Sequence, residues 1–187
     1  KDTSIKASIR TLLHASRTRR EELVNFISYL LEDDKTTEDA IKVLKNDMLN
    51  TMYDAPGIGL AAIQIGIPKR VVVMDLSKDP EKKNPMYFVN PVIKNKNQNL
   101  ATYEEGCLSV PDQFAEVDRP STCEVEYLDY HGEKKILKAE GLVATCIQHE
   151  MDHLEGILFI DYLSKLKKSM IIKKLSKQKN KPDRIVV

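Results

Sequence analysis

Long apolar runs are missing from this sequence of 187 residues. No segment approaches the roughly 20 consecutive apolar residues that a helix needs to cross a bilayer. The opening KDTSIKASIR also lacks the apolar core that a secretory signal carries. These absences predict a soluble cytoplasmic protein with no membrane partner, and the alternative location is an organelle after removal of a transit peptide.

Cysteine and histidine are scarce, with three and four copies. Because Cys107, Cys123 and Cys146 are odd in number and lie in unlike contexts, they argue against a disulfide framework and for a reducing compartment. Their thiols are then free to act as metal ligands. The sequence also lacks internal repeats and low-complexity linkers, so we expect a single domain over residues 1–187.

The charges are distributed unevenly along the chain. Residues 164–187 contain nine Lys or Arg and one Asp, a net charge of +8. The first 163 residues then carry −7, because the whole chain has a net charge of +1. A basic C-terminal helix and tail on an acidic body indicates either a polyanionic partner or simply a solvated helix face.

Hydrophobic periodicity predicts helices at both ends of the chain and strands between them. One helix is expected over residues 21–31, and a second begins at Thr36 or Thr37. A glycine-rich loop over residues 55–68 precedes a buried strand at 70–75. Further strands are expected at residues 86–89, around 99–103, at 122–128 and at 134–139, followed by a helix over 141–155 that faces the sheet.

The stretch QHEMDHLEG places His149 and His153 four residues apart on that helix, so both imidazoles can hold one metal ion. Glu150 lies beside the pair, where it can act as a general base on a water activated by the metal. Two histidines buried in a core without a metal are the alternative interpretation.

A catalytic metal site of this kind usually has three protein ligands. Cys146 lies about 10.5 Å along the helix from His153, so we expect it to line a pocket instead. Glu155 and Asp161 are conceivable third ligands. Cys107 is favoured, because the segment EEGCLSVP is flanked by strands and can bring a thiolate to the helix from across the fold.

Three segments together resemble the peptide deformylase family. GIGLAAIQ over residues 57–64, EGCLS over 105–109 and QHEMDH over 148–153 match its three motifs in order. The resemblance covers residues 47–166, whereas residues 1–35 and the ending NKPDRIVV differ from the usual pattern. It implies an α+β fold, with mixed or antiparallel sheets around the HExxH-bearing helix, N-terminal helices and a C-terminal helix.

The resemblance also implies a function. A hydrolase of this family removes the N-formyl group from the N-terminal methionine of new polypeptides and releases formate. Cys107, His149 and His153 would hold one divalent metal ion, Fe2+ in the cell or Zn2+, Ni2+ or Co2+ in the purified protein. Gln64 and the backbone N–H of Leu108 would stabilise the oxyanion.

Several other residues are expected around such a site. Ile58, Gly59, Leu142 and Cys146, with Thr145, are predicted to line the pocket for the methionine side chain. Arg119 is expected to pair with Glu105 or Asp152 and to hold the ligand loop against the helix.

Two other functions compete with deformylation. A zincin-type endopeptidase would need a third ligand downstream, but Phe159 occupies the position where metzincins have a histidine. A binding protein with a structural metal would have no use for Glu150.

The basic helix predicted after Ser164, with Leu163, Leu166, Met170 and Leu175 as its apolar anchors, suggests docking on the large ribosomal subunit. We expect no binding to DNA.

Overall fold

The structure is a computed structural model that describes residues 37–77, 79 and 81–179. Its elements follow one another in the order α3 (Thr37–Asp54), β1 (Gly59–Ala61), η1 (Ala62–Ile65), β2 (Val71–Met74), β3 (Met86–Lys96), β4 (Leu100–Cys107), β5 (Val110–Pro120), β6 (Thr122–Leu128), β7 (Lys134–Glu140), α4 (Gly141–Leu154), η2 (Phe159–Tyr162) and α5 (Lys165–Lys179). The helix expected over residues 21–31 lies outside the described residues.

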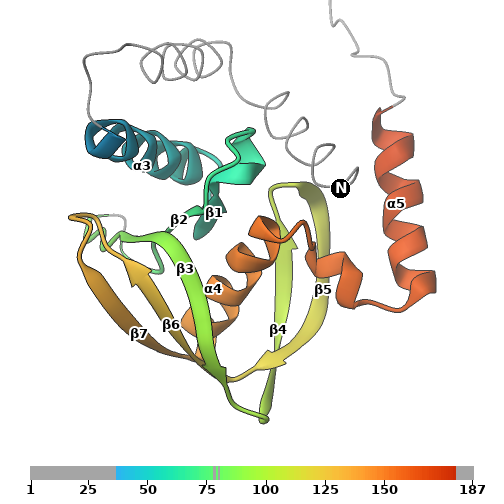
Figure 1. The fold of residues 1–187 in the computed structure, drawn as a ribbon. Helices are drawn as coiled ribbons and strands as arrows, with labels where there is room; N and C mark the ends of the chain where they lie inside the picture. Colours follow the sequence, from blue (N-terminus) through green and yellow to red (C-terminus); the bar gives the residue numbers. More distant parts are fainter. Residues whose placement is uncertain (1–36, 78, 80, 180–187) are drawn as a thin grey trace, which may run out of the picture.

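The strands form two antiparallel sheets. Five strands pair in the order β1-β2-β3-β6-β7, and β4 pairs with β5 in a separate hairpin. Helix α4 lies between the two sheets and contacts strands of both (Figure 1). The predicted α+β fold around a central HExxH helix is therefore confirmed, with every strand pair of the described part antiparallel.

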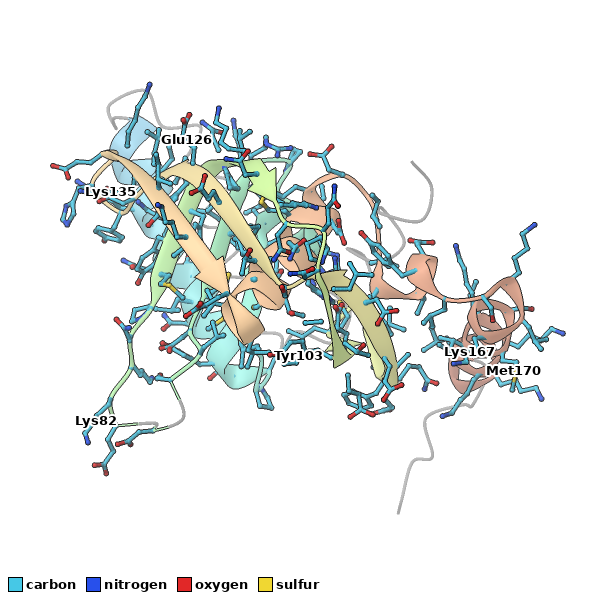
Figure 2. All side chains as sticks on the ribbon, turned by 90° about the horizontal axis from the view of Figure 1, so that it is seen from below. Lys82, Tyr103, Glu126, Lys135, Lys167 and Met170 are labelled. Atoms are coloured by element: carbon cyan, nitrogen blue, oxygen red, sulfur yellow. The ribbon has the colours of Figure 1, made fainter. Side chains whose placement is uncertain are left out.

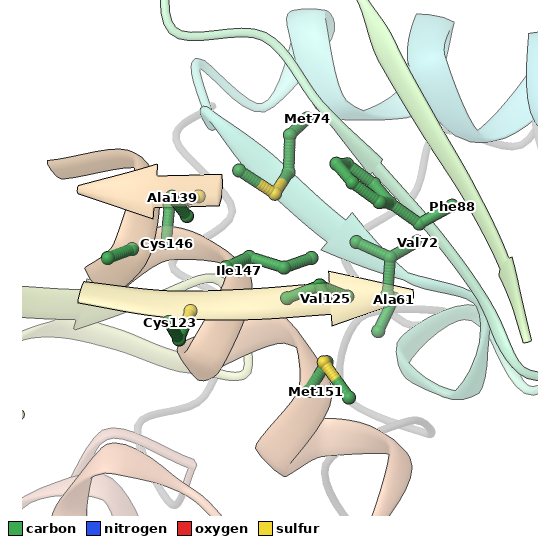
Figure 3. Packing of buried hydrophobic residues seen from close by; sticks show 11 residues of the cluster. Ala61, Val72, Met74, Phe88, Cys123, Val125, Ala139, Cys146, Ile147 and Met151 are labelled. Atoms are coloured by element: carbon green, nitrogen blue, oxygen red, sulfur yellow. The ribbon is translucent and has the colours of Figure 1, made fainter. Parts of the chain in front are cut away.

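Strand β2 is buried on both faces, which explains why its run RVVVM does not alternate between apolar and polar residues. Val71 and Val73 pack in one apolar cluster with residues of α3. Val72 and Met74 point to the other face, where they join a cluster with Ile147 of α4 (Figure 3). A strand that is covered on both faces buries every side chain, so a continuous apolar run is favoured over alternation.

The sequence-based prediction missed strand β5. Burial alternates from Asp112 to Arg119, but the buried Gln113 and Arg119 are polar and the exposed Phe114 is apolar. Asp112 has a φ of 58°, and the β4–β5 register shifts between Gly106 and Cys107, so side chains change face along the hairpin. A strand whose buried face carries polar side chains is hidden from a search for hydrophobic alternation.

Helix α5 begins where it was expected, since the backbone N–H of Lys167 donates to Ser164 Oγ at 3.4 Å. Its predicted anchors were only half right. Leu175 is buried, but Leu166 and Met170 are 72% and 62% exposed. Ile171 packs beside Leu175 instead. Leu166 and Met170 each lie five positions before one of these residues, roughly 140° around the helix, and therefore face away from the core. Figure 2 shows Met170 on the outer side of α5.

No helix in the described part of the chain is long and apolar enough to span a membrane.

Candidate metal centre

One thiol and two imidazoles meet between α4 and the β4–β5 hairpin. Candidate ligand atoms of Cys107, His149 and His153 all lie within 4.8 Å of one another. Cys107 Sγ is 3.2 Å from His153 Nε2, and the two imidazole rings are nearly perpendicular, with centroids 4.9 Å apart. Ligands of a tetrahedral ion with bonds of about 2.0–2.3 Å need this spacing, so the donor set fits a divalent metal.

Local structure explains why these three side chains converge. His149 and His153 lie one turn apart on α4 and are both buried, since the helix is covered by sheets on opposite sides. Cys107 is the last residue of β4, and its sulfur accepts the backbone N–H of Ser109 at 3.3 Å. The tight turn of the hairpin therefore points the thiolate at the helix.

A buried carboxylate orients one of the imidazoles. Glu105 Oε2 lies 2.7 Å from His149 Nδ1, which leaves Nε2 of that ring available for a metal. Arg119 donates to both oxygens of Glu105, at 2.5 and 3.0 Å, and to Asp152 at 2.7 Å. The expected pairing of Arg119 is thus confirmed with both partners. Burial alone would raise the pKa of Glu105, but the hydrogen bonds from His149 and Arg119 lower it, so the carboxylate is ionised.

Glu150 is a buried carboxylate beside the ligands. It is 5% exposed, and no described residue forms a hydrogen bond with its Oε2 atom. Burial raises its pKa to about 7, although the charges of His149 and Arg119 oppose the rise. A carboxylate tuned near neutral pH and left with a free oxygen is suited to accepting and returning a proton.

Gln64 has its side chain fixed from both ends. Its Oε1 atom accepts the N–H of Ala61 at 2.8 Å, and its Nε2 atom donates to Ser109 Oγ at 3.2 Å and lies 3.7 Å from Cys107 Sγ. The amide is buried and points at the ligand sulfur. This geometry contradicts the alternative of an exposed polar loop residue.

The other three candidate ligands lie elsewhere. Cys146 donates toward the carbonyl oxygen of Ile58, with a sulfur–oxygen distance of 3.8 Å. Glu155 forms an ion pair with Arg70, and Asp161 accepts the backbone N–H of Leu158. Cys107 is therefore the third member of the site.

Two contacts involve residues that were expected to line the pocket: Gly59 lies against Glu150, and Cys146 lies near the carbonyl oxygen of Ile58. Ile58 and Leu142 are exposed apolar side chains, whereas Cys146 and Thr145 are buried. A Cβ atom built on Gly59 would lie only 2.4 Å from Glu150 Oε1, so any side chain at this position would displace the Glu150 carboxylate.

Comparison with known proteins decides the family. The model of the family described as polypeptide deformylase matches residues 29–169. The chain belongs to the peptide deformylase family. Its activity is the metal-dependent removal of N-formyl groups from nascent peptides, and the Cys/His/His site provides the place for the metal.

Individual deformylases resemble the chain over most of its length. The peptide deformylase of Pelagibacter ubique is 65% identical over 180 residues, which cover 96% of this chain and 99% of the relative. That of Rhizobium meliloti is 55% identical over 76% of this chain and 82% of its own. The crystal structure of the Ehrlichia chaffeensis peptide deformylase superposes with a TM-score of 0.72 at 39% identity, covering 79% of this chain and 88% of that one.

Sequence reasoning missed three supporting contacts in this deformylase. Glu105 bonds to His149 directly, Tyr162 donates to Asp152 at 2.8 Å, and Phe159 stacks on the ring of His149. One signal was available: Glu105 and Cys107 are two residues apart on a strand and therefore share a face. The contacts of Tyr162 and Phe159 depend on how η2 folds back, which no local pattern indicates.

Proposed function

We propose that Cys107, His149 and His153 hold the catalytic metal and that Glu150 carries the proton in deformylation. The unpaired Glu150 oxygen beside the Cys/His/His set is the observation that carries this proposal. A purely structural metal site would gain nothing from a buried carboxylate without a partner, because leaving such a group unbonded costs free energy.

A divalent ion bound there would polarise the formyl carbonyl and lower the pKa of water from about 15.7 to about 7. Glu150 accepts the proton of the attacking water as a new bond forms to the formyl carbon. The same carboxyl then delivers that proton to the amine as the C–N bond breaks, so formate and a free N-terminus leave together. Burial, which raises the pKa of Glu150, favours a carboxyl that can both accept and return a proton.

Gln64 and Leu108 are proposed to stabilise the oxyanion that develops on the formyl oxygen. The Gln64 amide is held beside Cys107 by its bonds to Ala61 and Ser109, so it needs no reorganisation during the reaction. Leu108 follows Cys107 in the hairpin turn and supplies a backbone N–H at the same edge of the site.

The N-terminal methionine side chain is proposed to lie between Ile58, Gly59, Leu142 and Cys146. The exposed apolar side chains of Ile58 and Leu142 support this assignment, because exposed apolar surface beside a polar centre is typical of a binding pocket.

Fe2+ is proposed as the metal in the cell, and Zn2+, Ni2+ or Co2+ as substitutes in the purified protein. One thiolate and two imidazoles are ligands that all four ions accept. Elemental analysis of protein purified without oxygen, together with the activity of protein reconstituted with each ion, identifies the metal. Full activity with zinc alone and none with iron would contradict the proposal.

Formate release from a formyl-Met peptide tests the proposed substrate, with cleavage of an internal peptide bond measured in parallel. We expect rapid formate release and no internal cleavage. Internal cleavage by the metal-loaded protein would favour the endopeptidase alternative. Metal binding without either reaction would favour a binding protein.

Docking on the large ribosomal subunit through α5 is a further part of the proposal. Lysines at positions 165, 167, 173, 174 and 177 are exposed along this helix, and side chains that end in nitrogen project from it in Figure 2. Lys168 pairs with Asp161. Nascent chains emerge from a particle rich in phosphate, and binding to polyanions weakens steeply as salt rises.

A charge variant tests this docking better than a truncation, because α5 contributes the buried Leu175 to the core. Changing Lys173, Lys174 and Lys177 to Gln should reduce co-sedimentation with large subunits at low salt and leave formate release unchanged. The matched control changes Lys134, Lys135 and Lys138 of β7 to Gln. An equal loss of co-sedimentation in both variants would show that only the net charge matters, and it would reject α5 as the docking element.

A further inference from the structure

Asp75 is a buried carboxylate that the proposed chemistry does not use. It directly follows β2, it is 4% exposed, and its Oδ2 atom accepts the hydroxyl of Tyr53 at 2.5 Å. Oδ2 also accepts the N–H of Asn84 at 3.0 Å, while Oδ1 accepts the N–H and hydroxyl of Ser77 at 2.8 and 2.5 Å. Four donors thus satisfy one carboxylate, and they come from the last turn of α3 and both ends of the β2–β3 loop.

The backbone of Asp75 connects this cluster to the proposed active site. Its N–H donates to the carbonyl oxygen of Ile58 at 3.0 Å, and the same oxygen lies 3.8 Å from Cys146 Sγ. Gly59, which follows Ile58 in the chain, pairs with Met74 in the β1–β2 ladder. Because Gly59 lies directly against the Glu150 carboxylate, any displacement of this backbone changes the space around that carboxylate.

We propose that Tyr53 and Asp75 are positioning residues that hold the Ile58–Gly59 backbone against Glu150. The inference rests on the proposed roles of Ile58 in the methionine pocket and of Glu150 in proton transfer. The Tyr53 hydroxyl fixes the Asp75 carboxylate, and the Asp75 backbone fixes the Ile58 carbonyl. Deformylation then depends on a phenol that itself does not touch the substrate.

Removing the Tyr53 hydroxyl should disturb this arrangement with little change to packing. Oδ2 of Asp75 would keep only the N–H of Asn84, and a buried carboxylate that loses a donor moves toward solvent or another donor. The ring of Tyr53 lies in an apolar cluster with Lys83 Nζ 4.0 Å from its centroid, and phenylalanine retains both contacts. Tyr53→Phe therefore isolates the hydroxyl.

The expected consequence is a loss of both rate and selectivity. A displacement of about 1 Å in a reacting geometry can cost on the order of 100-fold, so a smaller shift of Gly59 should lower kcat/KM on the order of tenfold. Because Ile58 moves with Gly59, the preference for formyl-Met-Ala over formyl-Ala-Ala should fall several-fold. A residue with only a structural role would lower the thermal midpoint and leave this preference unchanged.

The test compares Tyr53→Phe with Tyr87→Phe in metal-loaded, full-length protein. Tyr87 is a matched control, because its ring packs in the same apolar cluster as that of Tyr53. The hydroxyl that bonds to Asp75, however, belongs to Tyr53. Metal content, the thermal midpoint and kcat and KM for both formyl dipeptides are measured well below the midpoint of each variant. Asp75→Asn should show the same loss of preference more strongly, and if it does not fold, Tyr53→Phe alone decides.

A wild-type preference in Tyr53→Phe, or an equal change in Tyr87→Phe, would overturn the positioning role. Failure of the wild-type protein itself to release formate would instead reject the proposed function, so the two failures are distinguishable.

Discussion

Helices α4 and α5 are nearly equal in length, at 14 and 15 residues, but they occupy opposite environments. In α4, every residue from Ala144 to Met151 is buried, including Gln148, His149 and Glu150. In α5, Leu175 is the only residue buried among those whose exposure the structure describes. The chain therefore contains one helix that is almost entirely interior and one that is almost entirely surface.

The two helices also differ in how their polar side chains are accommodated. Inside, His149 of α4 bonds to Glu105, which Arg119 also holds, whereas the Glu150 Oε2 atom has no partner among the described residues. The lysines of α5 need no such partners, because water solvates them. Changes in α4 should consequently affect chemistry, and changes in α5 should affect stability or docking.

The largest effect is expected for Glu150→Gln. The amide keeps the shape of the side chain but cannot carry the proton, and general acid–base catalysis contributes about 10²–10⁴-fold. We expect kcat for formate release to fall by that factor with metal content unchanged. Glu155→Gln, at the exposed end of the same helix, is the control and should retain wild-type turnover. Near-native kcat in metal-loaded Glu150→Gln would refute the assigned role.

Replacement of the cysteines should separate the metal ligand from the pocket wall. Cys107→Ser should lose metal or change metal selectivity, because a neutral hydroxyl is a poor substitute for a thiolate. Cys146→Ser, whose side chain points toward Ile58, should keep its metal. Elemental analysis of both folded variants is the measurement, and equal metal loss in the two would contradict the geometry.

A smaller effect is expected for Glu105→Gln. The amide weakens the bonds to His149 and Arg119, and loss of such an orienting partner costs about 10–100-fold in metal affinity or activity. Competition with a chelator measures the affinity. The neighbouring Glu104 is exposed, so Glu104→Gln is the matched control and should behave as wild type. A wild-type affinity in Glu105→Gln would show that Cys107, His149 and His153 bind the metal without help from this carboxylate.

Changes in α5 should have the smallest effect on catalysis and should act on stability instead. Leu175→Ala should lower the free energy of unfolding by about 2–4 kcal/mol, because it opens a cavity in the cluster around Phe159. Met170→Ala, on the exposed side, should change it by less than about 0.5 kcal/mol. Denaturant titration of the two variants measures both values. Similar losses would mean that the two sides of α5 are buried alike, in contradiction of the structure.

Much of the fold and site could be predicted from sequence because the signals were local. The spacing of His149 and His153, the apolar run of β2 and the cap at Ser164 each depend on neighbours within a few residues. The two features that were missed, strand β5 and the anchoring side of α5, have different causes. Strand β5 carries polar side chains on its buried face, and the anchoring side of α5 depends on which residues the η2 segment presents to it.

By itself, the sequence determined the helix that carries His149, Glu150 and His153, because the helical period places these side chains without reference to the rest of the chain. The tertiary structure alone decided that Cys107 is brought to that helix, that Glu105 orients His149 and that Tyr53 reaches Asp75. These contacts join residues 22 to 46 positions apart. Their geometry follows from how two sheets close around α4, and a local pattern carries no information about that closure.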